Sequence, residues 1–347
     1  MNTKIMTYLF LIAGLIALLI LFSCRKKSAN LKYGFSKEQD TIKFQNEIVK
    51  GIDATTFEIL DENYCKDKNQ VFYFRTYRES RDYFFTKKHQ IQKLENADAA
   101  SFLTLGYGYA KDNARAWYNG SNFKVADIPG LAALNHHFTQ DNINVYLDCK
   151  QVLGIDGSTF EIIDTYYAKD AKQYYYCNPG GDDQYSITAI PCQYESFSII
   201  DYQYSKDNKS VYFREKKMLM ADAASFIIIG SQYAKDNNNV YFNAKEIPGA
   251  DPNTFELFKE NENSNGETYY ARDKKGIYVN DQYFKDADAQ SFRIFNEKYT
   301  MDNQGIYYKM KKMKNADPTT FKVYPHYMGD ADAEDKHHKY GDGKVVE

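Results

Sequence analysis

The chain has 347 residues, of which 43% are hydrophobic, so it can bury a sizeable core and is not a disordered polymer. Its net charge is only −3, and the 44 Lys and Arg residues are mixed with 47 Asp and Glu. No basic stripe is offered to a phosphate backbone, which excludes nucleic acid as an expected partner. The 32 Tyr and 23 Phe against a single Trp favour half-buried strands, so we expect a mostly β protein.

The N-terminus has the pattern of an export signal. Residues 5–22 carry no charge and are followed by Ser23 and Cys24. The four residues 21–24 resemble a bacterial lipobox, in which a cysteine after a small residue is diacylated and becomes the mature N-terminus. We therefore predict a signal peptide over residues 1–23, lipidation at Cys24 and a polar tether over residues 24–30. This places the protein in the bacterial cell envelope, anchored to the membrane, with the following domain exported to the periplasmic or surface side.

Two alternatives to this anchor remain open. Eighteen apolar residues at roughly 1.5 Å each approach the thickness of a bilayer core, so residues 5–22 could be an uncleaved helix. The basic residues 25–27 would then hold the following domain in the cytoplasm. A plain cleaved signal is the third option. The cysteine at the end of the apolar run favours the lipoprotein.

Residues 31–347 are periodic, and the clearest unit runs from Tyr233 to Phe258. A Lys-Asp pair marks each copy, with a base period of 29 residues and insertions of 4, 8 or 16. Glu38 opens the series and Asp335 begins what we interpret as a truncated last copy, which predicts about nine repeats plus that copy. The aspartates between them are Asp67, Asp112, Asp141, Asp170, Asp207, Asp236, Asp273 and Asp302.

A second marker, Asp-x-x-Ser/Thr-Phe, keeps the same rhythm. It recurs at 53–57, 98–102, 156–160, 222–226, 251–255, 288–292 and 317–321, with departures at 127–131 and 193–197. The first Asp can accept backbone N–H groups of the next residues, which predicts a capped turn that delivers the Phe into a core.

The residues around each Lys-Asp pair predict a β-hairpin. Asp, Asn and Lys cluster between aromatic runs, which is the chemistry of a tight turn. The run after the turn, such as residues 211–213, is apolar on both faces and so predicts a strand covered on both sides by neighbouring repeats. A single hairpin cannot bury its own face. We therefore predict an all-β fold of tandem hairpin repeats stacked as an elongated meander or solenoid, with a propeller-like closure as the alternative.

These repeats resemble those of the DKNYY family of bacterial envelope proteins. The closest matches to the pattern Tyr-x-Lys-Asp-x-x-x-Val-Tyr-Tyr lie at 109–112, 167–176 and 233–242. Gln140 and Met301 in place of Lys, and Trp117 in place of Tyr, depart from it. The family is defined by its repeats, so the resemblance implies a fold and a location more than an activity.

The cysteines after Cys24 form no C-x-x-C metal motif. Cys177 and Cys192 bracket the insertion in the fifth repeat, and we predict that an exported chain could join them in a disulfide worth roughly 3 kcal/mol. Cys65 and Cys149 are interpreted as reduced thiols.

The sequence carries no sign of a cofactor or a catalytic centre. Oxygen-rich turns invite a calcium site, but they lack EF-hand spacing and turn formation explains them. The pairs His136-His137 and His337-His338 are interpreted as surface or loop residues, and no nucleophile elbow, P-loop or dinucleotide fingerprint is present. We expect no metal and no enzyme.

Three functions remain open at this level. The first is a non-catalytic envelope protein whose repeated surface, rich in Tyr and lined by Lys-Asp pairs, binds a glycan, a peptide or another envelope protein. The second is an envelope hydrolase with a site in the irregular segments 75–93 or 178–191. The third is a structural spacer without a ligand.

Overall fold

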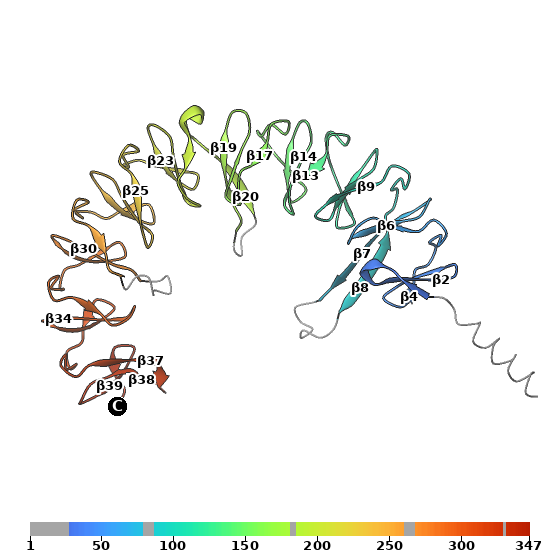
Figure 1. The fold of residues 1–347 in the computed structure, drawn as a ribbon. Coiled ribbons are helices and arrows are strands. Elements are labelled where there is room, and N and C mark those ends of the chain that lie inside the picture. The colour runs from blue at the N-terminus through green and yellow to red at the C-terminus, as the bar shows by residue number, and fades with distance from the viewer. Residues whose placement is uncertain (1–27, 79–86, 181–184, 260–267, 329–330) are drawn as a thin grey trace, which may run out of the picture. The chain divides into compact units, whose positions relative to one another are not determined.

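The computed structural model describes residues 28–78, 87–180, 185–259, 268–328 and 331–347 (Figure 1). These residues form ten four-stranded sheets, and each sheet consists of four consecutive strands. The predicted all-β tandem repeat is confirmed. Two details differ from the prediction: each repeat contributes four strands rather than a two-stranded hairpin, and the last copy is a complete sheet rather than a truncated one.

The chain divides into two compact units within the fifth sheet. Of the described residues, the first unit contains 28–78, 87–162, 169–171, 180 and 185–186, and the second contains 163–168, 172–179, 187–259, 268–328 and 331–347.

The first four sheets belong to the first unit. Their strands are β1 (Ser28–Asn30), β2 (Phe35–Glu38), β3 (Thr41–Phe44) and β4 (Glu47–Ile48); β5 (Glu58–Ile59), β6 (Tyr64–Lys66), β7 (Val71–Tyr77) and β8 (Lys88–Lys93); β9 (Leu103–Gly106), β10 (Tyr109–Lys111), β11 (Ala116–Tyr118) and β12 (Ser121–Phe123); and β13 (Ala132–Ala133), β14 (Phe138–Gln140), β15 (Val145–Leu147) and β16 (Lys150–Val152). The fifth sheet contains β17 (Glu161–Ile162), β18 (Tyr167–Lys169), β19 (Tyr174–Asn178) and β20 (Ser186–Ile190).

The last five sheets belong to the second unit. Their strands are β21 (Ser198–Ile199), β22 (Tyr204–Lys206), β23 (Val211–Phe213) and β24 (Lys216–Met218); β25 (Ile227–Gly230), β26 (Tyr233–Lys235), β27 (Val240–Phe242) and β28 (Lys245–Glu246); β29 (Glu256–Leu257), β30 (Tyr270–Asp273), β31 (Gly276–Val279) and β32 (Gln282–Phe284); β33 (Arg293–Ile294), β34 (Tyr299–Asp302), β35 (Gly305–Tyr308) and β36 (Lys311–Lys312); and β37 (Lys322–Met328), β38 (Ala331–Glu334), β39 (Lys339–Gly341) and β40 (Lys344–Val345). Two 3-10 turns, η1 (Lys32–Gly34) and η2 (Tyr194–Ser196), accompany the strands.

Three turns connect the four strands of a sheet, and local chemistry explains each of them. The first turn of the sixth sheet is closed by Asp201, whose Oδ1 accepts the backbone N–H groups of Gln203 (2.8 Å) and Tyr204 (2.6 Å). The second turn follows the Lys-Asp pair. The third turn is a two-residue hairpin turn with left-handed residues, as at Asn243 and Ala244 in the seventh sheet, with φ of 47° and 63°.

The first and third turns lie at one end of each sheet, which we call the turn end. The second turn and the linker from the previous sheet lie at the other, which we call the Lys-Asp end. The insertions that lengthen the 29-residue period emerge at the turn end, between β7 and β8, β19 and β20, β29 and β30, and β37 and β38. The linkers and second turns at the Lys-Asp end carry no such insertions.

The core lies between consecutive sheets rather than inside one. One buried cluster combines three strands of the sixth sheet, the linker and two strands of the seventh: Tyr204, Val211, Met218, Ala223, Phe226, Ala234 and Tyr241. Because side chains alternate across a pleat, Tyr212, the neighbour of Val211, packs instead with Tyr167, Tyr176 and Ile190. The prediction of strands covered on both sides by neighbouring repeats is confirmed.

Candidate functional site

The Lys-Asp end is the most polar recurring feature of the fold, so it is the first candidate for a site. Asp236 illustrates how the residues at this end are arranged. This carboxylate is buried, and its Oδ1 accepts the N–H groups of Asn238 (2.7 Å) and Asn239 (2.8 Å), which closes the second turn. Its Oδ2 accepts the N–H of Asp222 (2.9 Å), in the linker, and the hydroxyl of Tyr241 (2.8 Å). One carboxylate therefore joins the linker, the turn and the third strand.

The bond between linker and second turn recurs in nine sheets. The N–H of the first residue of the linker marker donates to Oδ2 of the Lys-Asp aspartate at these distances: 53 to 67, 2.7 Å; 98 to 112, 3.0 Å; 127 to 141, 3.0 Å; 156 to 170, 3.2 Å; 193 to 207, 2.8 Å; 222 to 236, 2.9 Å; 251 to 273, 2.7 Å; 288 to 302, 2.7 Å; 317 to 335, 2.8 Å. A hydrogen bond that recurs between equivalent residues in nine sheets stabilises the fold.

The linker marker is itself a capped turn, as predicted. Asp222 accepts the N–H of Ala224 (3.2 Å) and the hydroxyl of Ser225 (2.5 Å), and Ser225 Oγ then accepts the N–H of Asn237 (3.1 Å). The two motifs are thus interlocked. In the third linker, Gly130 stands where the Ser or Thr would be, and the Nδ2 of Asn142 donates directly to Asp127 instead (2.6 Å).

Hydrogen bonding lowers the pKa of Asp141, Asp207 and Asp335. Burial alone would raise the pKa of Asp207, but donors from Gln193, Tyr212 and the second turn outweigh it, and the pKa is lowered. The same balance lowers the pKa of Asp335 to about 2. A general acid or base needs a pKa near the operating pH, so these groups are poorly suited to proton transfer.

The lysine of the Lys-Asp pair links one sheet to the next. Its Nζ donates to a carbonyl of the capped turn that leads into the following sheet: Lys37 to Ala54 (2.5 Å), Lys66 to Ala99 (3.1 Å), Lys111 to Ile128 (3.0 Å), Lys206 to Ala223 (3.1 Å) and Lys235 to Pro252 (2.8 Å). The tyrosine two residues before this lysine makes a second link, as when Tyr64 donates to the carbonyl of Gly108 (2.8 Å). The lysine and tyrosine side chains that were predicted to face a ligand therefore form hydrogen bonds between neighbouring repeats.

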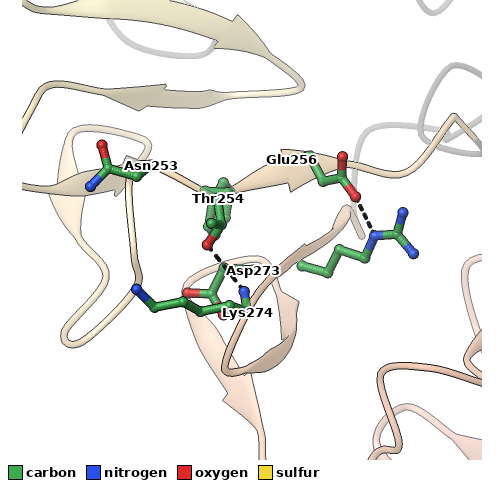
Figure 2. Close-up of a pocket in the computed structure, with 7 residues that line it drawn as sticks. Asn253, Thr254, Glu256, Asp273 and Lys274 are labelled. Atoms are coloured by element: carbon green, nitrogen blue, oxygen red, sulfur yellow. Dashed lines mark hydrogen bonds and ion pairs between the residues drawn. The ribbon is translucent and has the colours of Figure 1, made fainter.

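One hollow of about 480 Å³ opens at the Lys-Asp end of the eighth sheet (Figure 2). Its charged groups are already paired. Lys274 Nζ lies 2.6 Å from Asp251, Arg272 donates to Glu256, and Asp273 accepts the N–H of Asp251 (2.7 Å). The lining residues are Asn253, Thr254, Phe255, Glu256, Arg272, Asp273 and Lys274. The hollow is a wider version of the contact between linker and second turn that recurs in the other sheets. None of its lining residues is a nucleophile without a hydrogen-bond or ion-pair partner.

The predicted disulfide is not formed. Cys65, Cys149, Cys177 and Cys192 are free thiols. Cys177 follows Tyr176 in β19, so its side chain points to the opposite face of the sheet from Tyr176. Cys192 packs with Tyr176 against the cluster on that other face. Tyr176, and not Cys177, therefore shares a cluster with Cys192.

The remaining predicted residues occupy separate places. Cys24 and the apolar segment 5–22 lie outside the described residues, as do parts of the segments 75–93 and 178–191. His137 contacts Asp148 (2.9 Å), and His338 lies near Asp335 in the last sheet. In the part of the chain that the structure describes, no three His, Cys, Asp or Glu side chains gather as a metal site, and no helix is long and apolar enough to cross a membrane.

Sequence reasoning missed the hydroxyl of the tyrosine five residues after the Lys-Asp aspartate. That tyrosine was interpreted only as a strand residue. Its recurrence was a readable signal, since it bonds the aspartate at 146, 212, 241, 278, 307 and 340. In the second and third sheets Phe72 and Trp117 replace it.

The fold and the recurring contacts at the Lys-Asp end define the class of this protein. It is a tandem array of four-stranded β-sheets whose recurring polar residues hold the sheets together. The chain belongs to the DKNYY family, whose profile matches residues 35–179, 77–216, 181–240 and 204–344. The predicted resemblance is confirmed. Searches among curated proteins and among solved structures find no match.

Proposed function

We propose that this chain is a non-catalytic, membrane-anchored envelope lipoprotein whose repeat array acts as a scaffold or binding surface. The observation that carries the proposal is the saturation of the recurring carboxylates. Asp236 and its equivalents accept hydrogen bonds from the backbone, and six of them also accept one from a tyrosine, so the recurring residues support the fold. A catalytic role would require such groups to be free to bind substrate or exchange protons.

A ligand would have to bind residues other than the recurring tyrosines and Lys-Asp pairs that the sequence indicated. The recurring tyrosines are buried, among them Tyr64, Tyr167 and Tyr299, and the Lys-Asp pairs are engaged within the array. Exposed aromatic side chains remain at the turn end, including Tyr107 and Tyr202. A glycan or another envelope protein would meet these turns and the insertions beside them. Nucleic acid stays an unexpected partner at a net charge of −3.

The anchoring part of the proposal rests on the N-terminal sequence. Cys24 follows an uncharged run and a small residue, which is the context in which a lipoprotein cysteine is acylated. Metabolic labelling with a palmitate analogue should mark the wild-type chain and not Cys24→Ala. Cys192→Ala is the matched control and should label like wild type. Membrane attachment of an unlabelled wild-type chain would replace the lipid anchor with an uncleaved helix.

The hydrolase and the plain spacer are the competing functions. The hollow of Figure 2 favours neither substrate binding nor catalysis, because its charges are paired with one another. Crosslinking of the full-length tagged chain in cells separates the two non-catalytic functions. A defined adduct lost on changing Tyr107 or Tyr202 to Ser would support a binding surface. Adducts that do not depend on these residues would support the spacer.

A further inference from the structure

The second sheet carries a strongly basic hairpin. Residues 71–93 contain six basic and two acidic residues, a net charge of +4 in a chain whose total is −3. The described arms, residues 71–78 and 87–93, contain Arg75, Arg78, Lys87, Lys88 and Lys93 and no carboxylate. This hairpin is one of the insertions, with β7 and β8 seven and six residues long, so it extends beyond its sheet at the turn end (Figure 1).

The base of the hairpin meets an exposed apolar turn of the first sheet. Leu31 is 38% exposed and Tyr33 is 48% exposed, with the exposed Lys32 between them. The ring of Tyr33 lies 6.2 Å from that of Phe74 in β7, so this turn and the hairpin form one continuous surface. We call residues 31–33 with Arg78 and Lys87 the basic face, because Arg75 and Lys88 alternate onto the opposite face of the hairpin from Phe74. The carboxylates at this end of the two sheets are Glu47, beside the third turn of the first sheet, and Asp61 and Glu62, on the first turn of the second.

We propose that the basic face is a membrane-contact surface that binds anionic lipid headgroups. This inference rests on the proposed function, because the anchor at Cys24 would hold the chain at a bilayer. Aliphatic and tyrosine side chains beside Lys and Arg are the combination that suits a membrane interface, where the apolar parts enter the headgroup region and the cations meet phosphates.

The path of the chain allows the anchor and the basic face to reach the same surface. Ser28 follows Cys24 by four residues, a span of at most about 14 Å. β1 pairs Ser28 with Glu38 and Asn30 with Ser36, so it runs from the Lys-Asp end back to the turn end over about 10 Å. A tether that rises from the bilayer to Ser28 is thus long enough for Leu31 to return to it.

Lipid also explains the surface better than a soluble polyanion does. A polyanion needs cations alone, whereas Leu31 and Tyr33 leave apolar area exposed next to them. Confinement by the tether raises the effective concentration of headgroups, so a modest electrostatic contact would be well populated.

The test uses the full-length chain in vesicles of phosphatidylcholine, with or without one third phosphatidylglycerol, and follows backbone hydrogen exchange. Peptides covering 31–35 and 71–78 should exchange about tenfold more slowly in the anionic vesicles, and the protection should vanish in high salt. The variant Lys32→Glu/Arg78→Glu/Lys87→Glu should lose it. The matched control, Lys311→Glu/Lys312→Glu/Lys314→Glu, reverses three exposed lysines of the ninth repeat and should keep it.

Equal exchange in both vesicle types, or equal loss in the control variant, would overturn the proposal. So would protection by soluble dextran sulfate in neutral vesicles without protection by phosphatidylglycerol. The lipid anchor is tested separately from the basic face. A chain that washes off neutral vesicles and takes no label at Cys24 would refute the lipoprotein, whatever the hydrogen-exchange pattern.

Discussion

Asp236 accepts at Oδ2 the backbone N–H of Asp222, which lies fourteen residues earlier, at 2.9 Å. The two residues belong to the two different motifs that mark the repeat. Their bond fixes the linker against the second turn of the same sheet, while Lys235 reaches forward to the next linker at Pro252 (2.8 Å). The Lys-Asp pair therefore has two tasks, closing its own sheet through the aspartate and joining the following sheet through the lysine.

Replacing Asp236 should destabilise the seventh sheet. Asp236→Asn keeps one acceptor oxygen for the second turn but presents an amide donor to the N–H of Asp222, so the free energy of unfolding should fall by about 2 kcal/mol. Asp236→Ala should cost about 3 kcal/mol or more. Asp40→Asn, on an exposed turn of the first sheet, is the control and should change stability by less than about 0.5 kcal/mol.

The measurement has to resolve single repeats, because tandem arrays need not unfold in one step. Hydrogen exchange at the amides of Asp222, Asn238 and Asn239 should accelerate in Asp236→Asn, alongside a lower urea midpoint. Unchanged exchange at Asp222 would show that this amide has another acceptor in solution.

Lys235→Met tests the coupling between repeats. The methionine keeps the apolar stem but removes the bond to the Pro252 carbonyl, so we expect a loss of about 0.5–1 kcal/mol. The loss is modest because the chain carries Met301 at the equivalent place. Native-state hydrogen exchange should show the seventh and eighth sheets opening more independently. Lys217→Met, on the exposed outer edge of β24, should leave their exchange unaltered.

The sequence was informative where the chemistry is local. Asp236 and Asn238 lie two residues apart, so a turn between them could be predicted, as could the capped turn at Asp222. The partner of Asp236 at a distance of fourteen residues could not, because sequence gives no distance between a linker and a turn. The fourth strand of the sheet was also missed, since β28 is only two residues long and carries too few residues for a readable alternation.

The predicted disulfide, which the structure does not contain, rested on the spacing of its two cysteines alone. Cys177 and Cys192 flank one insertion, and loop arithmetic treats such residues as neighbours. Whether two cysteines can bond depends on the face to which each side chain points, and a shift of one residue reverses that face. Tyr176 rather than Cys177 shares the cluster with Cys192.

Acid should unfold the array over a narrow range. The ordinary aspartate pKa is 3.8, and hydrogen bonds lower the pKa of Asp335 to about 2 despite its burial. The pKa of Asp251 falls to about 2, mainly through the bond from Lys274. Because the folded-state pKa is depressed, this stability is present above about pH 4 and is lost as the pH falls toward about 2.

The thermal unfolding midpoint should therefore be flat between about pH 7 and 5 and drop steeply below about pH 4. The drop should be steeper than for a protein with one such carboxylate, because aspartates in many repeats take up protons together. A midpoint that already falls between about pH 7 and 5 would point to histidine rather than aspartate as the controlling group.

Thiol labelling tests the absence of the disulfide and the burial of the cysteines together. Burial raises the pKa of Cys177 to about 12 and that of Cys149 to about 11, and it also raises the pKa of Cys65. Since the thiolate is the reactive form, native Cys24→Ala chain should label slowly at about pH 8. In urea without reductant, four thiols should react. Only two would react if export oxidised Cys177 and Cys192 to each other, and Cys177→Ser would then expose a third, which distinguishes a true disulfide from incomplete unfolding.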